Sequence, residues 1–156
     1  MRTRVLVVAV AAVLLVASLA AGQFRRGGRG GYAPRALRYA TADDIDGSFQ
    51  FCRVVYRQNR NGDGGSWGVD FPRADQNLST RLAELTRTPV GRLPDGEPNH
   101  LLVNLSDPVV FRCPFIMATE VGTLFLGDEE AATLRAYLQK GGFLWVDDFW
   151  GEYAWD

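Results

Sequence analysis

The fold is constrained most by the last legible part of the chain, which reads as a helix followed at once by a buried strand. Residues 128–130 are all acidic and suit the positive end of a helix. The apolar face of this helix consists of Ala131, Leu134, Tyr137 and Leu138. Gly141-Gly142 ends the helix, and the apolar run 143–146 then leads into Asp147-Asp148. With a strand before it, this pattern is a βαβ unit, which predicts a mostly parallel sheet covered on both faces.

Segments upstream extend the same α/β pattern. Residues 49–58 are rich in aromatic and β-branched residues and predict a strand. Residues 59–75 are rich in Gly, Asn and Asp and predict a long loop. Two shorter apolar segments, 101–105 and 115–119, predict further buried strands. We therefore expect a three-layer α/β domain over residues 48–156.

A helix is expected over residues 77–87. Its apolar positions, at helical spacing, are Leu78, Leu82 and Leu85. Asp75 or Asn77 would cap its start, and Pro89 would stop it.

The N-terminus has the pattern of a signal peptide over residues 1–22. Arg2 and Arg4 precede an apolar run from Val5 to Ala17, and small residues then permit cleavage after Ala20 or Gly22. The alternative is an uncleaved membrane anchor, because the apolar run approaches the length of a membrane span. Either way, the sequence predicts an extracytoplasmic protein, periplasmic or secreted, with membrane association through this segment if it stays attached.

The charge changes sign along the chain. Residues 1–47 hold seven Arg and three Asp, a net of +4, whereas residues 48–156 hold ten basic and fifteen acidic residues, a net of −5. The Gly/Arg-rich stretch that begins at residue 23 has no apolar period, so a flexible linker is expected over 23–47; contact with anionic lipid is the alternative. An acidic domain is a poor candidate for binding nucleic acid. The candidate ligands that remain are a small molecule, a cation and a protein partner.

The chain has two cysteines, Cys52 and Cys113, and each lies in or beside an apolar, strand-like segment. An oxidising compartment permits a disulfide between them. Two buried thiols that pack as small apolar side chains are the alternative.

From about Phe49 to Asp156, the chain resembles domain-of-unknown-function family 4159, which occurs in exported and membrane-attached bacterial proteins. The run from Asp128 to Asp148 is the most specific part of the resemblance. The other marks are Arg53, Tyr56, Gly64-Gly65-x-Trp67, Asn77-Leu78 and Cys113-Pro114-Phe115-Ile116-Met117. The resemblance implies a flavodoxin-like sheet related to class I glutamine-amidotransferase-like domains, and it implies no activity.

Two departures from the family pattern affect what we expect. Where family members often have Gly-His after the middle strand, this chain has Glu120-Val121-Gly122. The family domain also continues with further elements, so the resemblance implies that this domain is incomplete at its C-terminus. A missing strand and helix would expose a sheet edge and a helix face.

Candidate ligand-binding residues follow from the expected sheet, because open parallel sheets bind ligands beyond the carboxyl ends of their strands. The candidates are Trp67, Glu120, Asp147, Asp148 and Trp150. The three carboxylates could hold Mg²⁺ or Ca²⁺ through oxygen, or they could bind a sugar stacked on a tryptophan. The alternative is that the acids cap or pair locally and the tryptophans only pack.

No catalytic set can be assembled from the sequence. Residues 61–65 lack the spaced acids of a calcium loop and the Lys-Ser/Thr of a phosphate loop. The tight turn at Glu120 has no Cys or Ser, and the single histidine, His100, precedes its strand. We therefore expect a non-catalytic binding or interaction domain with a crevice at the strand ends. The alternative is a cation-dependent or degenerate hydrolase that uses the same acids.

Overall fold

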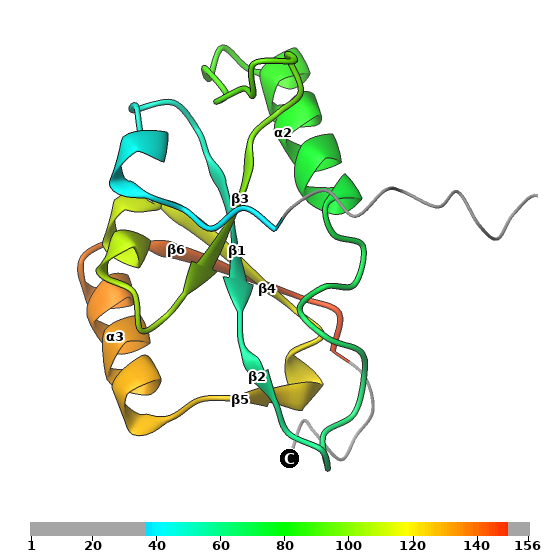
Figure 1. Cartoon of the computed structure of the whole chain (residues 1–156), viewed down its shortest axis with the longest axis vertical. Helices are drawn as coiled ribbons and strands as arrows, with labels where there is room; N and C mark the ends of the chain where they lie inside the picture. Colours follow the sequence, from blue (N-terminus) through cyan, green and yellow to red (C-terminus); the bar gives the residue numbers. More distant parts are fainter. Residues whose placement is uncertain (1–36, 150–156) are drawn as a thin grey trace, which may run out of the picture. The chain divides into compact units, whose positions relative to one another are not determined.

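A four-stranded parallel sheet forms the centre of the domain (Figure 1). The computed structural model describes residues 37–149. The strand order is β3-β1-β4-β6, and every neighbouring pair is parallel. The strands are β1 (Phe51–Val55), β3 (His100–Asn104), β4 (Phe115–Thr119) and β6 (Phe143–Asp147). This order places the first strand in the interior, as in flavodoxin-like sheets.

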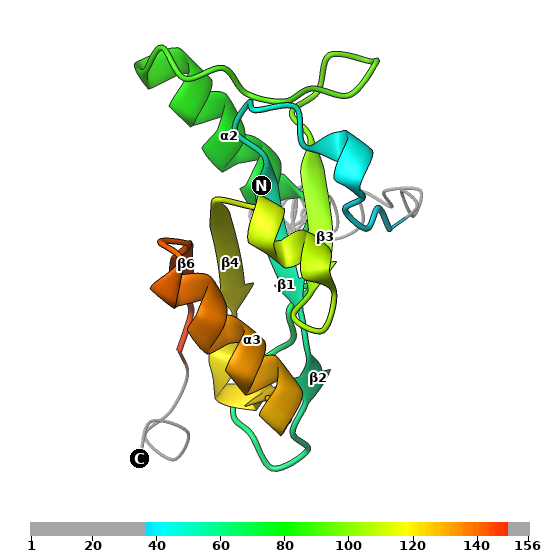
Figure 2. The same ribbon diagram turned by 90° about the vertical axis from the view of Figure 1, so that its left-hand side faces the viewer.

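Two helices cover opposite faces of the sheet. α2 (Arg73–Leu85) and α3 (Asp128–Gln139) lie on either side of the strands in Figure 1, and Figure 2 shows α3 in front of the sheet. The structure thus confirms the mostly parallel α/β fold that the sequence predicts. Within the described range, no helix is long and apolar enough to span a membrane.

Shorter elements connect these parts. A small antiparallel pair joins β2 (Arg57–Gln58) to β5 (Leu124–Phe125). Three 3-10 helices are η1 (Ala42–Asp44), η2 (Pro108–Arg112) and η3 (Val121–Thr123). Residues 37–47, the end of the expected linker, already contact the sheet, because Tyr39 bridges to Leu102 and Ala40 is buried. The folded unit therefore includes residues ahead of Ser48.

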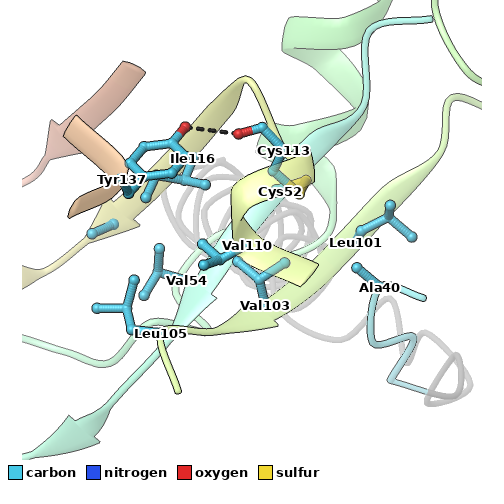
Figure 3. Packing of buried hydrophobic residues seen from close by; sticks show 11 residues of the cluster. Ala40, Cys52, Val54, Leu101, Val103, Leu105, Val110, Cys113, Ile116 and Tyr137 are labelled. Atoms are coloured by element: carbon cyan, nitrogen blue, oxygen red, sulfur yellow. Dashed lines mark hydrogen bonds between the residues drawn. A yellow bond between two sulfur atoms is a disulfide. The ribbon is translucent and has the colours of Figure 1, made fainter. Parts of the chain in front are cut away.

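The main apolar core lies between the sheet and α3. Alternate residues of the strands point to this side; its buried members are shown in Figure 3 and are Ala40, Cys52, Val54, Leu101, Val103, Leu105, Val110, Cys113, Ile116, Ala118 and Tyr137. Cys52 and Cys113 form a disulfide inside this core, and neither is exposed to solvent. The disulfide links β1 to Cys113, which lies two residues before the start of β4.

The junction between α3 and β6 explains the Gly141-Gly142 pair. Gly141 has a φ of +89°, a left-handed conformation that ends the helix. A Cβ on Gly142 would come within 2.3 Å of the Tyr137 ring. The hydroxyl of that ring donates hydrogen bonds to the carbonyl oxygens of Cys113, at 2.8 Å, and Phe143, at 3.2 Å. Burial raises the pKa of Tyr137 to about 12, so the hydroxyl stays a donor that ties α3 to both strands.

The α2 side of the sheet is organised around a buried ion pair. Arg53 in β1 and Asp75 in α2 are both fully buried. The guanidinium donates to both Asp75 carboxylate oxygens, and its Nη1 donates to the carbonyl oxygens of Trp67, at 3.0 Å, and Val69, at 3.2 Å. Burial raises the pKa of Asp75, while the guanidinium opposes that shift. The pair holds β1, the loop before α2 and α2 together.

The Arg53–Asp75 ion pair goes with a start of α2 that differs from the predicted one. α2 begins at Arg73 rather than Asn77, and Asp75 lies inside its first turn instead of capping it. The buried positions of α2 are Asp75 and Ser79, whereas Leu85, expected on the apolar face, is 80% exposed. The strand expected over 49–58 is also divided, because Tyr56 separates β1 from β2.

We predict that Asp75→Ala lowers the free energy of unfolding by ~3–5 kcal/mol, because it leaves a buried guanidinium without its counter-charge. Urea unfolding followed by circular dichroism measures the change. The matched control is Glu84→Ala, which breaks the exposed Arg81–Glu84 pair and should cost at most ~1 kcal/mol. The double variant Arg53→Met/Asp75→Leu should be more stable than Asp75→Ala; if it is equally unstable, the charge is not the cause.

We predict that the Cys52→Ala/Cys113→Ala variant is less stable by ~2–4 kcal/mol, because the unfolded chain loses a cross-link between cysteines 61 residues apart. Urea unfolding with and without dithiothreitol checks this. Reductant should lower the midpoint of the wild-type protein, once it has unfolded, and leave the variant unchanged. An equal response of both proteins would contradict the prediction.

Candidate functional site

Open parallel sheets bind ligands at the carboxyl ends of the two strands between which the strand order reverses. In this sheet those two strands are β1 and β4. The strand order reverses there, because the chain leaves β1 towards β3 on one side and β4 towards β6 on the other. In this protein the loop after β1 covers that point. Asn59 N–H donates to the Thr123 carbonyl oxygen at 2.7 Å, and Asp63 N–H donates to the Gly122 carbonyl oxygen at 3.2 Å. The loop after β1 therefore lies against the turn that follows β4.

Glu120 is the residue that fixes this arrangement. It follows β4 directly, with a left-handed backbone (φ 55°, ψ 43°) that is uncommon for a side chain of its size. Its Oε2 accepts a hydrogen bond of 2.8 Å from Gly65 N–H. The Tyr56 hydroxyl donates to the carbonyl oxygens of Thr119, at 2.7 Å, and Glu120, at 2.8 Å. These bonds hold the turn in place, and Glu120 is only 5% exposed.

The remaining acids lie at the β6 side of the same edge. Asp147 ends β6, and its carbonyl oxygen accepts a 2.9 Å hydrogen bond from Glu120 N–H, so the ends of β4 and β6 are adjacent. Loss of solvation raises the pKa of Asp148, and the charges of Asp147, Glu120 and Asp70 raise it further. Asp70, Glu120 and Asp148 are also the non-glycine residues with positive φ in the described part of the chain. Carboxyl groups from three segments therefore lie close enough for their charges to act on Asp148.

A hollow of about 290 Å³ adjoins these acids on the α2 side of the sheet. Its floor comes from β1, β4 and β6, and its wall comes from α2. The lining residues are Phe51, Ala74, Asn77, Leu78, Arg81, Met117, Trp145 and Asp147. The lining is mostly apolar, with Arg81 on the wall and Asp147 on the floor as the charged groups, so the hollow suits a ligand with an apolar part.

Trp67, one of the two expected tryptophans, lies away from the hollow. The Trp67 ring packs edge-on against Phe71 with centroids 6.0 Å apart, and the Trp67 carbonyl oxygen accepts from Arg53. Trp67 does not line the hollow. Trp150 lies outside the described residues. Of the four expected site residues that the structure describes, Glu120, Asp147 and Asp148 lie near one another, and Asp147 alone borders the hollow.

The two cysteines and the histidine make contacts away from the carboxyl edge. Both cysteines are in the disulfide, so neither presents a thiolate. His100 is buried at the start of β3, where its ring packs against Phe71 at 5.6 Å and its Nδ1 lies 3.3 Å from the Pro98 carbonyl oxygen. Between residues 37 and 149, no three His, Cys, Asp or Glu side chains form a ready-made metal cage.

Two residues of this region, Asp70 and Trp145, were not among those predicted from the sequence. Asp70 comes from a long loop, and nothing in the local pattern distinguishes it from other loop acids. Trp145 could have been found, because it lies two residues from Asp147 and a strand places alternate residues on the same face.

The family comparison agrees with the marks described above. The family model of a domain of unknown function (DUF4159) matches residues 50–156. No curated protein matches the chain. The match covers the whole sheet, α2, α3 and all the acids of the carboxyl edge. The chain belongs to the DUF4159 family.

Proposed function

We propose that this chain is an exported binding domain that recognises a positively charged ligand at the β6 side of the sheet's carboxyl edge. The observation that carries the proposal is the position of Asp148, whose pKa is raised first by loss of solvation and then by repulsion from the nearby carboxylates of Asp147, Glu120 and Asp70. A cation placed among these carboxylates would relieve that repulsion. The ligand approaches from β6, because the loop after β1 closes the β1–β4 position.

The hollow supports an organic cation in particular. Asp147 belongs both to the acid group and to the hollow, so a ligand can place its charge at the carboxylates and an apolar portion over Trp145 and Met117. Trp145 is 43% exposed, which leaves part of its ring face available to such a ligand. A bare Mg²⁺ or Ca²⁺ would use the acids and leave the hollow empty.

Export is supported by two features. The arginine-flanked apolar run at residues 5–17 has the pattern of a signal peptide, with cleavage after Ala20 or Gly22. The buried disulfide is typical of proteins that fold in an oxidising compartment.

The binding proposal predicts a rise in melting temperature with benzylammonium chloride that exceeds the rise with sodium chloride at equal ionic strength. Saturating ligand at ~100 times its Kd would stabilise the fold by ~2.7 kcal/mol. The rise should disappear in Asp147→Asn and persist in Asp43→Asn, an exposed control in η1. Scanning calorimetry measures it. If benzylammonium shifts the wild-type protein no more than neutral benzyl alcohol does, the proposal fails.

The same measurement with MgCl₂ and CaCl₂ tests the alternative of a cation-dependent hydrolase. That alternative needs a divalent ion held by the acids, so it gains if the divalent salts stabilise the protein through Asp147 and benzylammonium does not. Ester and phosphate-ester hydrolysis assayed with the bound ion would then decide between binding and catalysis.

We predict that Asp148→Asn raises the melting temperature at pH 7 by about 1–2 °C, the scale of a surface charge change. The folded-state pKa of Asp148 lies above its unfolded value, so ionisation destabilises the fold once the pH exceeds that folded pKa. The gain should vanish as the pH falls below the ordinary carboxyl range. Asparagine tolerates the left-handed backbone, so the comparison isolates the charge. A gain that persists at low pH would show another cause.

A further inference from the structure

The loop after β1 contains an asparagine that is followed directly by a glycine, Asn61-Gly62. In such a pair the backbone nitrogen of the glycine can reach the side-chain amide carbon of the asparagine with little hindrance, because glycine has no Cβ. Asparagine is among the thermally labile residues, and this neighbour makes it most reactive. The other asparagines precede larger residues, which are Arg, Leu, His and Leu after Asn59, Asn77, Asn99 and Asn104.

Contact with the turn after β4 requires a glycine at position 62. A Cβ on Gly62 would lie 2.4 Å from the Gly122 carbonyl oxygen and 2.6 Å from the Thr123 Cα, and both are backbone atoms that no side-chain movement can clear. Hydrogen bonds on either side hold the same contact. Asp63 N–H donates to Gly122, and Asn59 N–H donates to Thr123. The close packing that covers the carboxyl edge therefore places a glycine directly after the asparagine.

Asn61 lies in a turn at the protein surface, and the residue is exposed. Its N–H donates to the side-chain oxygen of Asn59 at 3.0 Å, and the Gly62 N–H donates to the Asn59 carbonyl oxygen at 3.1 Å. The second bond slows any reaction of the Gly62 nitrogen, because that nitrogen must lose its proton before it attacks. A single exposed turn opens far more readily than the sheet, so the reaction proceeds from the opened turn.

We propose that Asn61 is a site of spontaneous deamidation, and that the product releases the loop after β1 from the turn after β4. The deprotonated nitrogen of Gly62 bonds to Cγ of Asn61, the Cγ–Nδ2 bond breaks, and ammonia leaves with the proton. Water then opens the resulting succinimide at one of its two carbonyl groups. The products are aspartate and isoaspartate, and in isoaspartate the main chain runs through Cγ.

Isoaspartate lengthens the main chain by one methylene group immediately before Gly62. Because Gly62 already lies directly against Gly122 and Thr123, a longer main chain at this point moves it out of contact. The hydrogen bonds that Asn59 and Asp63 donate to the same turn are displaced with it. The modification thus acts in one direction, and it uncovers the β1–β4 part of the carboxyl edge.

Incubation of the purified protein at mildly alkaline pH, followed by peptide mapping, tests the site. Mass spectrometry of peptic fragments should show loss of the amide at Asn61, and the loss should be faster at higher pH because hydroxide removes the Gly62 proton. Asn59 is the internal control, since it is exposed in the same loop but precedes arginine, and it should stay intact. Asp63 also precedes a glycine, but its isomerisation leaves the mass unchanged.

Amide hydrogen exchange, resolved by NMR, tests the release of the loop. Exchange at the Asn59 and Asp63 amides should be faster in the isoaspartate form than in fresh protein. The amide of Leu102, which is bonded at the far edge of the sheet, should exchange at an unchanged rate.

Two variants separate the longer main chain from the new charge. Asn61→Gln is the matched control, because its longer side chain closes a ring less readily, and it should keep its amide and its slow exchange through the same incubation. Asn61→Asp, measured before incubation, has the charge with a normal main chain, and it should also keep the slow exchange.

Three results would overturn the proposal. One is an Asn61 that survives incubation as well as Asn59 does. Another is an isoaspartate form that exchanges as slowly as fresh protein. The third is a fresh Asn61→Asp variant that has already lost the slow exchange, because the longer main chain would then not be the cause. None of these results bears on the benzylammonium measurement, which concerns the β6 side of the edge.

Discussion

On the α2 side of the sheet, the positive charge of Arg53 lies entirely inside the protein, where water cannot solvate it. Asp75 supplies the counter-charge, and two carbonyl oxygens of the loop before α2 accept hydrogen bonds from Nη1 of the guanidinium. Because a lone buried charge is strongly unfavourable, the loop and the first turn of α2 must both be in place before β1 is stable there. The position of the loop in turn sets the position of Gly65 and Asp70, and so the geometry of the carboxyl edge. The opposite side of the sheet needs no such device, because it is covered by an ordinary apolar core.

The parts of the fold that the sequence predicted are those set by local patterns. The strand at 115–119, the helix that begins at Asp128, its glycine stop and the final strand all follow from period, helix-end charge and backbone freedom. The start of α2 was wrong because Asp75 reads as a cap locally, while its partner Arg53 lies 22 residues away. For the carboxyl edge, the sequence placed Glu120, Asp147 and Asp148 on neighbouring strand ends. It gave no means to foresee that Gly65 binds Glu120, or that Asp70 approaches from a loop, because both depend on how a long loop folds back.

The carboxyl edge thus has two parts with different characters. At β1 and β4 it is covered by the loop after β1, which is held by backbone hydrogen bonds and by the Glu120 side chain. At β6 it is open, acidic and next to a hollow with an apolar floor. At the turn after β4, the Glu120 carboxylate accepts a backbone hydrogen bond from Gly65. The turn therefore joins the loop after β1 to the end of β4 and adds a carboxylate to this edge.

The disulfide has a consequence for the order of events during folding. Both sulfur atoms lie in the completed core, with Tyr137 and α3 packed against the same region. An oxidant can reach the two thiols only while β1 and the segment ahead of β4 are still accessible. Oxidation must therefore precede the final closure of the α3 side, and afterwards the same burial shields the bond from thiol reagents. The disulfide in the folded protein therefore depends on oxidising conditions at the time when its core closed.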